Sequence, residues 1–106
     1  MENLVTREQF TEKIQELIDS DEIPFSVAIA DIDNFKNINN VYGQEIGDQV
    51  IRKTVSILRQ NISDGDLITR HGDEFSVLLL DKGAERSFIY MEEIRKYLSK
   101  NAFEFF

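Results

Sequence analysis

Apolar residues along the 106-residue chain follow two different periods. In three stretches they recur every three or four residues, which predicts amphipathic helices, and in three others they alternate with polar residues or run together, which predicts strands. The predicted helices lie between Thr6 and Pro24, from about residue 46 to 61, and from about residue 84 to 100. The predicted strands are 25–33, the two arms of 66–80, and 102–106.

Local signals support these elements. Thr6 and Gln9 have the spacing of a capping box, and Pro24 stops the first helix. Two apolar runs flank His71-Gly72, which is typical of a β-hairpin. The polar segment Asn34–Glu45 has no clean period, so we expect a loop or short helix there, before a helix opened by Gly47 and Asp48. The apolar stripes of the three helices are Phe10, Ile14, Leu17 and Ile18; Val50, Ile51, Val55, Leu58 and Ile62; and Phe88, Met91, Ile94 and Leu98.

The order of the elements predicts the fold. After the first helix it is β-α-β-β-α-β, the ferredoxin-like split βαβ arrangement. We therefore expect an α+β palm core, with an antiparallel sheet, helices packed on one face and an extra N-terminal helix. The length fits a single domain over residues 1–106. Fold alone does not establish function.

Candidate chemistry lies at the end of the first strand. Because side chains alternate along a strand, Asp31 and Asp33 share one face with Phe25, Val27 and Ile29. That edge of an open sheet with helical crossovers is where ligands usually bind. One interpretation is a divalent-metal site, because buried acids are costly unless paired or bound to metal. The other is a strand running out into a solvated turn.

The hairpin adds two more acids, Asp73 and Glu74, at the start of its second strand. If the hairpin lies beside the first strand, three or four carboxylates converge. Hard oxygen ligands of this kind suit Mg²⁺ or Mn²⁺, with water and substrate phosphates completing the shell. Metal-assisted phosphoryl or nucleotidyl transfer needs such an arrangement.

The amino-acid composition limits the kinds of partner that the chain can bind. The formal charge is −8, from 20 acidic and 12 basic residues, which argues against a surface for duplex nucleic acid. The absence of cysteine excludes disulfides and thiolate metal sites, and a single histidine disfavours a histidine-rich zinc site. No apolar run approaches the roughly 20 residues of a membrane span, and no signal peptide is visible. We therefore expect a cytoplasmic domain with no membrane contact of its own.

Two motifs resemble a known family. The run Asp31-Ile32-Asp33-Asn34-Phe35-Lys36, followed by Ile38-Asn39, Tyr42-Gly43 and Gly47-Asp48, resembles the first signature of GGDEF domains, the diguanylate cyclases. The run His71-Gly72-Asp73-Glu74-Phe75 resembles the motif that names the family, with one glycine changed. The resemblance covers nearly all of the chain. It implies GTP as substrate and cyclic di-GMP as product. Two facing sites would be needed to make that product, so we expect a homodimer.

The resemblance also implies roles for individual residues. The catalytic residues would be Asp31, Asp73 and Glu74. Two metal ions would be held by Asp31, the backbone carbonyl of Ile32, and Asp73 or Glu74, with Glu74 also a candidate general base. The substrate-binding residues would be Asn34, Phe35 and Lys36 at the phosphates, Asn39 and Asp48 at the guanine edge, and Gly72 in the hairpin.

The sequence departs from the family at three places. The hairpin has one residue fewer between Arg70 and the acids, which could shift its register and turn Asp73 and Glu74 away. Ser63 stands where the family's feedback-inhibition site has an arginine, three residues before Asp66, so we expect no product inhibition there. The chain ends at Phe106, before the family's later elements and the lysine and arginine that they bring to the triphosphate.

Two alternatives stay open. One is a catalytically inactive GGDEF-like module that binds a nucleotide or another protein. The other is a minimal cyclase similar to the CRISPR polymerase palm, which would use ATP. The discriminating observation is geometric. The enzyme is favoured if the Asp31 carboxylate lies within about 4–5 Å of that of Asp73 or Glu74, close enough to share a metal.

Overall fold

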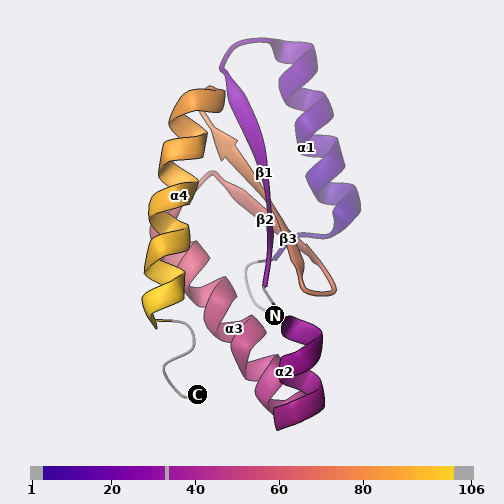
Figure 1. The fold of residues 1–106 in the computed structure, drawn as a ribbon. Helices are drawn as coiled ribbons and strands as arrows, with labels where there is room; N and C mark the ends of the chain where they lie inside the picture. Colours follow the sequence, from indigo (N-terminus) through magenta and orange to yellow (C-terminus); the bar gives the residue numbers. More distant parts are fainter. Residues whose placement is uncertain (1–3, 33, 102–106) are drawn as a thin grey trace.

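The computed structural model describes residues 4–32 and 34–101, and it has the predicted α+β architecture (Figure 1). In chain order the elements are α1 (Arg7–Ser20), β1 (Phe25–Asp31), α2 (Phe35–Tyr42), α3 (Gln44–Asn61), β2 (Leu67–His71), β3 (Glu74–Leu80) and α4 (Ala84–Asn101). The strand predicted at 102–106 lies outside the described residues, as does Asp33. Among the described helices, none is long and apolar enough to cross a membrane.

The three described strands form one antiparallel sheet with the order β1-β3-β2. The middle strand, β3, is buried on both faces, and Val77, Leu78 and Leu79 have no exposed surface. This explains why its sequence runs as consecutive apolar residues and does not alternate. The outer edge of β1 has no partner strand within 4–32 and 34–101.

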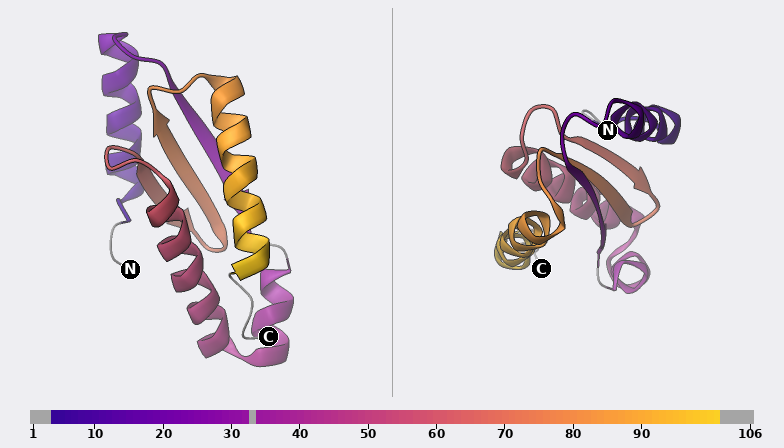
Figure 2. Two further views of the ribbon diagram at one scale, coloured as in Figure 1. Left: turned by 90° about the vertical axis from the view of Figure 1, so that its left-hand side faces the viewer. Right: turned by 90° about the horizontal axis from the view of Figure 1, so that it is seen from above.

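Helices cover the two faces of the sheet unequally. Helices α3 and α4 pack on one face and α1 packs on the other, so that the sheet lies between them (Figure 2). The larger core includes Val50, Ile51, Val55, Leu58, Ile62, Ile68, Phe75, Val77, Leu79 and Ile94. The smaller core consists of Phe10, Leu17 and Leu78, with partly buried neighbours. The two core helices thus share one face, as predicted, and the extra N-terminal helix covers the other.

The start of α1 confirms the predicted capping box. The Thr6 hydroxyl accepts a hydrogen bond from the Gln9 N–H at 3.1 Å, and the Gln9 side chain accepts one from the Thr6 N–H at 2.9 Å. The helix ends at Ser20, before Asp21 in a left-handed conformation. Ile18, which the sequence placed in the buried stripe, is 56% exposed.

The segment after β1 forms the short helix α2, one of the two forms expected for it. Two other expectations about the helices need correction. Helix α3 begins at Gln44, so Gly47 and Asp48 lie inside its first turns and do not open it. Gly43, with φ of 91°, makes the sharp turn between these helices. Phe88 in α4 is not a core residue but is 68% exposed, because it lies beside the unpaired edge of β1. The side chain of Leu98 lies outside the described part.

Candidate functional site

The carboxyl end of β1 lies next to the beginning of β3. In the register of the sheet, Asp31 is opposite Glu74, and Glu74 is opposite His71 on its other side. Opposed residues share a face of the sheet, with Cβ atoms about 4.5–5.5 Å apart. The one-residue shortening of the hairpin therefore does not turn Glu74 away from Asp31.

The hairpin turn consists of Gly72 and Asp73. Gly72 has φ of 64°, a left-handed conformation that glycine adopts without strain. Asp73 therefore lies in the turn and not in the second strand, where the sequence placed it together with Glu74. The carbonyl of Asp73 accepts a hydrogen bond from the Ile32 N–H at 3.2 Å. This bond ties the turn to the end of β1, and Glu74, not Asp73, is the acid paired with Asp31.

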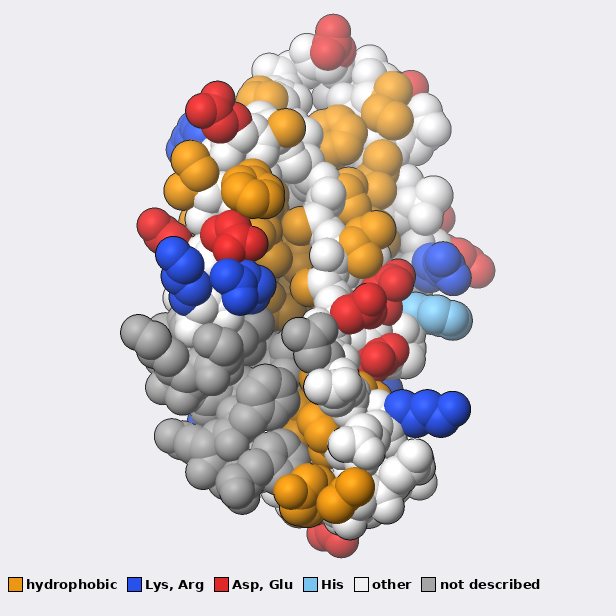
Figure 3. All heavy atoms as spheres, in the orientation of Figure 1, with side chains coloured by type: hydrophobic (Ala, Val, Ile, Leu, Met, Phe, Trp, Pro, Cys, Tyr) orange, Lys and Arg blue, Asp and Glu red, His pale blue; other side chains and the backbone are white. Residues whose placement is uncertain are grey.

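The carboxylates at this end have no partner among the side chains that the structure describes. Asp31 is exposed, Asp73 and Glu74 are half-buried, and no described side chain forms a hydrogen bond or ion pair with them. Figure 3 shows acidic side chains gathered beside the histidine on this face. Adjacent unpaired negative charges repel one another, and a bound cation would relieve that repulsion.

The oxygen ligands at this end of the sheet fit a metal ion that keeps water and phosphate in its coordination shell. Among the described residues, no group of three or more histidine, aspartate or glutamate side chains is arranged to hold a metal. Mg²⁺ typically binds through one or two carboxylates together with waters and substrate phosphates, and not in an all-protein cage. Asp31 and Glu74 suit that mode. The Ile32 carbonyl accepts from the Phe35 N–H at 3.3 Å and retains a second lone pair.

The other predicted substrate residues belong to the helical pair α2–α3. Asn34 precedes α2 with φ of 58°, and Lys36 is exposed in its first turn. Because the Phe35 N–H donates to Ile32, it is already engaged. Asn39 on α2 and Asp48 on α3 are both half-buried, and the turn at Gly43 folds their helices together.

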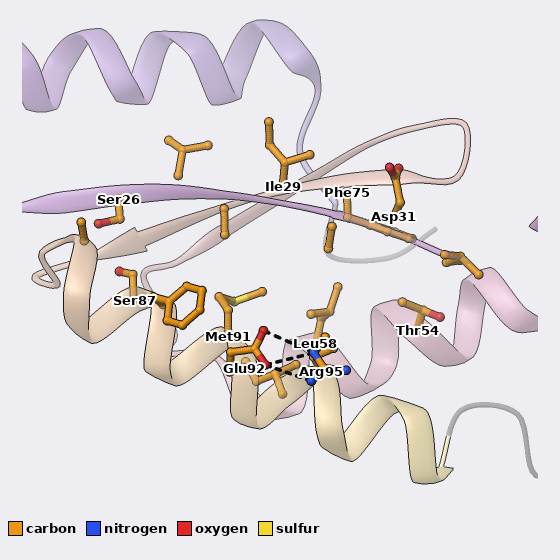
Figure 4. Close-up of a pocket in the computed structure, with 17 residues that line it drawn as sticks. Ser26, Ile29, Asp31, Thr54, Leu58, Phe75, Ser87, Met91, Glu92 and Arg95 are labelled. Carbon is orange, nitrogen blue, oxygen red and sulfur yellow. Dashed lines mark hydrogen bonds and ion pairs between the residues drawn. The ribbon is translucent and has the colours of Figure 1, made fainter. Parts of the chain in front are cut away.

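A cavity of about 840 Å³ lies along the outer edge of β1, between that strand and α4 (Figure 4). In Figure 4, Asp31 and Ile29 point to the side of β1 away from α4, whereas Ser87, Met91 and Glu92 line the cavity from α4. Its lining is mainly apolar, and Glu92 is paired with Arg95 in the same helix at 3.0 Å. Because the lining is mainly apolar and the cavity runs along an open edge of the sheet, we assign no phosphate site to it.

The described groups with displaced pKa values lie away from the carboxylate pair. The side-chain hydrogen bond from Arg95 lowers the pKa of Glu92. Burial raises the pKa of Tyr90, and the negative charge of Asp66 raises it further. Asp66 is only 1% exposed, and its two carboxylate oxygens accept hydrogen bonds from the Ser63 N–H at 3.0 Å and the Leu80 N–H at 2.9 Å. Asp66 therefore has a structural role here.

The sequence pattern placed Gly47 only at the start of a helix, whereas the structure buries it in α3 against Asn39. The signal that could have found it is the adjacency of Gly47 to Asp48 in the first motif.

Comparison with known proteins identifies the class of domain. The family model described as "Diguanylate cyclase, GGDEF domain" matches residues 1–106. Among curated relatives, the "Probable diguanylate cyclase DgcT" of Escherichia coli K12 is 38% identical over 92 residues, 86% of this chain. The response regulator PleD of Caulobacter vibrioides is 37% identical over 81 residues, 76% of this chain. The chain spans 20% of DgcT and 18% of PleD.

Solved structures agree with the sequence matches. The GGDEF domain of DgcB from Caulobacter crescentus, solved in complex with c-di-GMP, matches 93% of this chain with a TM-score of 0.84 and 29% identity. The active GGEEF domain of a diguanylate cyclase from Vibrio cholerae matches 92% with a TM-score of 0.81 and 28% identity. This chain covers 60% of the first and 64% of the second.

Proposed function

Since the chain belongs to the GGDEF domain family of diguanylate cyclases, we propose that it condenses two molecules of GTP to cyclic di-GMP with Mg²⁺ or Mn²⁺ as cofactor. The observation that supports this proposal best is the register of the sheet, which pairs Asp31 with Glu74 on one face. Two unpaired carboxylates at that place have no structural task among the described residues, but they suit a cation that accompanies a nucleotide.

Asp31 and Glu74 would hold the cation, with the Ile32 carbonyl as a further ligand and Asp73 close by in the turn. When bound, the ion lowers the pKa of a 3′-hydroxyl and neutralises charge on the phosphates. The carboxylates of the chain fix its position against the end of the sheet. Glu74 is half-buried and a candidate general base, but it cannot easily serve as ligand and base at once.

The helical pair α2–α3 would bind the nucleotide. The N–H groups of Asn34 and Lys36 would bind phosphate, since the Phe35 N–H is engaged by Ile32, and the exposed Lys36 side chain would add positive charge. Asn39 and Asp48 would recognise guanine. A carboxylate accepts from the ring N–H and the amino group, and the Asn39 amide, whose oxygen is buried, can donate through its N–H₂. Gly72 would let the base or phosphate approach the hairpin closely.

One site binds one nucleotide, so the cyclic product requires two chains with their sites facing each other. We therefore propose a homodimer, at least during turnover. An enzyme that uses ATP, and an inactive domain that only binds nucleotide, would share the same fold, so the products must be identified directly.

The test is an incubation of the purified chain with Mg²⁺ or Mn²⁺ and either GTP or ATP, with products identified by mass spectrometry. We expect cyclic di-GMP from GTP, and a loss of about 10²–10³-fold in Asp31→Ala, as is typical when preorganised charge stabilisation is removed. Asp64→Ala, an exposed acid in the loop before β2, is the matched control and should keep full activity. Product from ATP alone, or no product at high protein concentration, would contradict the proposal.

A further inference from the structure

The side-chain amide of Asn39 lies directly against Gly47. A Cβ atom at Gly47 would overlap the Asn39 Oδ1 and would come within 2.8 Å of its Cγ and 3.4 Å of the Phe35 Cζ. The amide of Asn39 therefore occupies the space that the methyl group of an alanine would need. This contact joins α2 to α3, one residue before Asp48.

Backbone conformation does not require glycine at this position. Gly43 and Gly72 have positive φ, but Gly47 lies inside α3, where its N–H donates to the Gly43 carbonyl at 3.2 Å. Glycine is a poor helix former, so at this position it weakens the helix. What the missing side chain provides is room for Asn39.

The contact also fixes the orientation of Asn39. Its amide oxygen is buried and has no hydrogen-bond partner among the described residues. A buried polar atom without a partner is unusual in a native protein and calls for an explanation. With the oxygen held against α3, the plane of the amide is set before a ligand arrives, which lowers the ordering cost of binding.

We propose that Gly47 is a positioning residue for base recognition: because it has no side chain, Asn39 keeps the orientation in which it and Asp48 recognise guanine. The inference rests on the proposed function, since it concerns the same nucleotide site. It predicts that a methyl group at residue 47 weakens guanine binding by moving Asn39, while binding through the phosphates and the metal ion is largely kept.

The test compares the dissociation constants of two nucleotide analogues by calorimetry in the presence of Mg²⁺. The analogues are GTP and ATP with an α,β-methylene bridge, which binds but cannot release pyrophosphate. Gly47→Ala should raise the dissociation constant of the GTP analogue about tenfold, as expected for one lost hydrogen bond to the base, and that of the ATP analogue by less than about twofold. Gly83 has open space around it, so Gly83→Ala is the matched control and should change neither constant.

A double variant separates positioning from folding. In Asn39→Ala the amide is gone, so adding Gly47→Ala should change the GTP constant by less than about twofold, because the two substitutions remove the same interaction. Thermal unfolding and the Asn39 side-chain amide resonances of Gly47→Ala should show a folded protein in which that amide has shifted. The proposal is overturned if the two substitutions add independently, if both analogues weaken equally, or if Gly47→Ala binds the GTP analogue normally. If the unmodified chain binds neither analogue, the proposed function is wrong, and the inference about Gly47 is wrong with it.

Discussion

Asp31 and Asp66 stand at opposite ends of the same sheet, and their surroundings differ in a way that separates function from stability. Asp66 is buried, and backbone N–H groups from Ser63 and Leu80 bind its two carboxylate oxygens. Asp31 is exposed, pairs in register with another acid, and has no hydrogen-bond partner among the described side chains. The Asp66 carboxylate is therefore satisfied by hydrogen bonds within the fold, whereas the Asp31 carboxylate is available to a ligand.

The largest effect expected from this difference is on stability. Asp66→Asn should lower the free energy of unfolding by about 3 kcal/mol, because an amide can accept from only one of the two buried N–H groups and its own N–H₂ opposes the other. Asp31→Asn, an exposed substitution of the same chemistry, should change it by less than about 0.5 kcal/mol. Urea denaturation of the two variants measures both values. Equal destabilisation would mean that Asp31 is also structural.

A second, somewhat smaller effect should appear only at the Asp31 end. A ligand at about 100 times its dissociation constant stabilises the folded state by about 2.7 kcal/mol. The GTP analogue with Mn²⁺ should therefore raise the melting temperature of the unmodified chain by several degrees, and EDTA should reverse most of the shift. In Asp31→Asn the metal-dependent part should vanish. In Asp66→Asn the melting temperature without ligand should fall, but the rise caused by the analogue and Mn²⁺ should remain. A metal-dependent shift that survives in Asp31→Asn would place the cation elsewhere.

Local signals were sufficient to predict much of the fold. The capping box at Thr6, the apolar stripe of α3 and the hairpin all depend on residues close together in sequence, and the structure has all three. For helix α2 the sequence left a loop and a short helix both open, because three asparagines weaken its helical pattern. Its half-buried residues Phe35 and Ile38 pack against the larger core, and such packing stabilises a short helix more than its own propensity does.

The two ends of the sheet also differ in how far their roles could be predicted from residues close together in sequence. Asp31 could be singled out because the period of a strand fixes its face, and its neighbour Glu74 followed once the hairpin was placed beside it. The role of Asp66 could not be predicted, because one of its two donors is 14 residues away in β3. The contact between Gly47 and Asn39 could not be predicted for a similar reason, since the two residues lie on different helices.

The smallest effect expected from the comparison lies at alkaline pH, at the Asp66 end. Burial raises the pKa of Tyr90, and the charge of Asp66 adds to this, so the folded chain holds the phenol proton more tightly than the unfolded chain. That contribution to stability is complete below the unfolded pKa of about 10 and is lost as the pH rises through the folded value. The Lys82 ammonium lies 4.9 Å from the centre of the Tyr90 ring. A variant that keeps an aromatic ring at residue 90 keeps this lysine beside it, so the lysine is common to the variant and the unmodified chain.

Tyr90→Phe removes the proton and keeps the ring, so it isolates this contribution. Between about pH 8 and 9 the unfolding free energies of the unmodified chain and Tyr90→Phe should run parallel, and above about pH 10 that of the unmodified chain should fall more steeply. Urea denaturation across this range measures the difference, and the lysines that titrate there cancel between the two proteins. Identical slopes above pH 10 would show that neither burial nor the Asp66 charge raises the pKa of Tyr90. The electrostatic half of the contrast with Asp31 would then be lost, although the hydrogen-bonded half would stand.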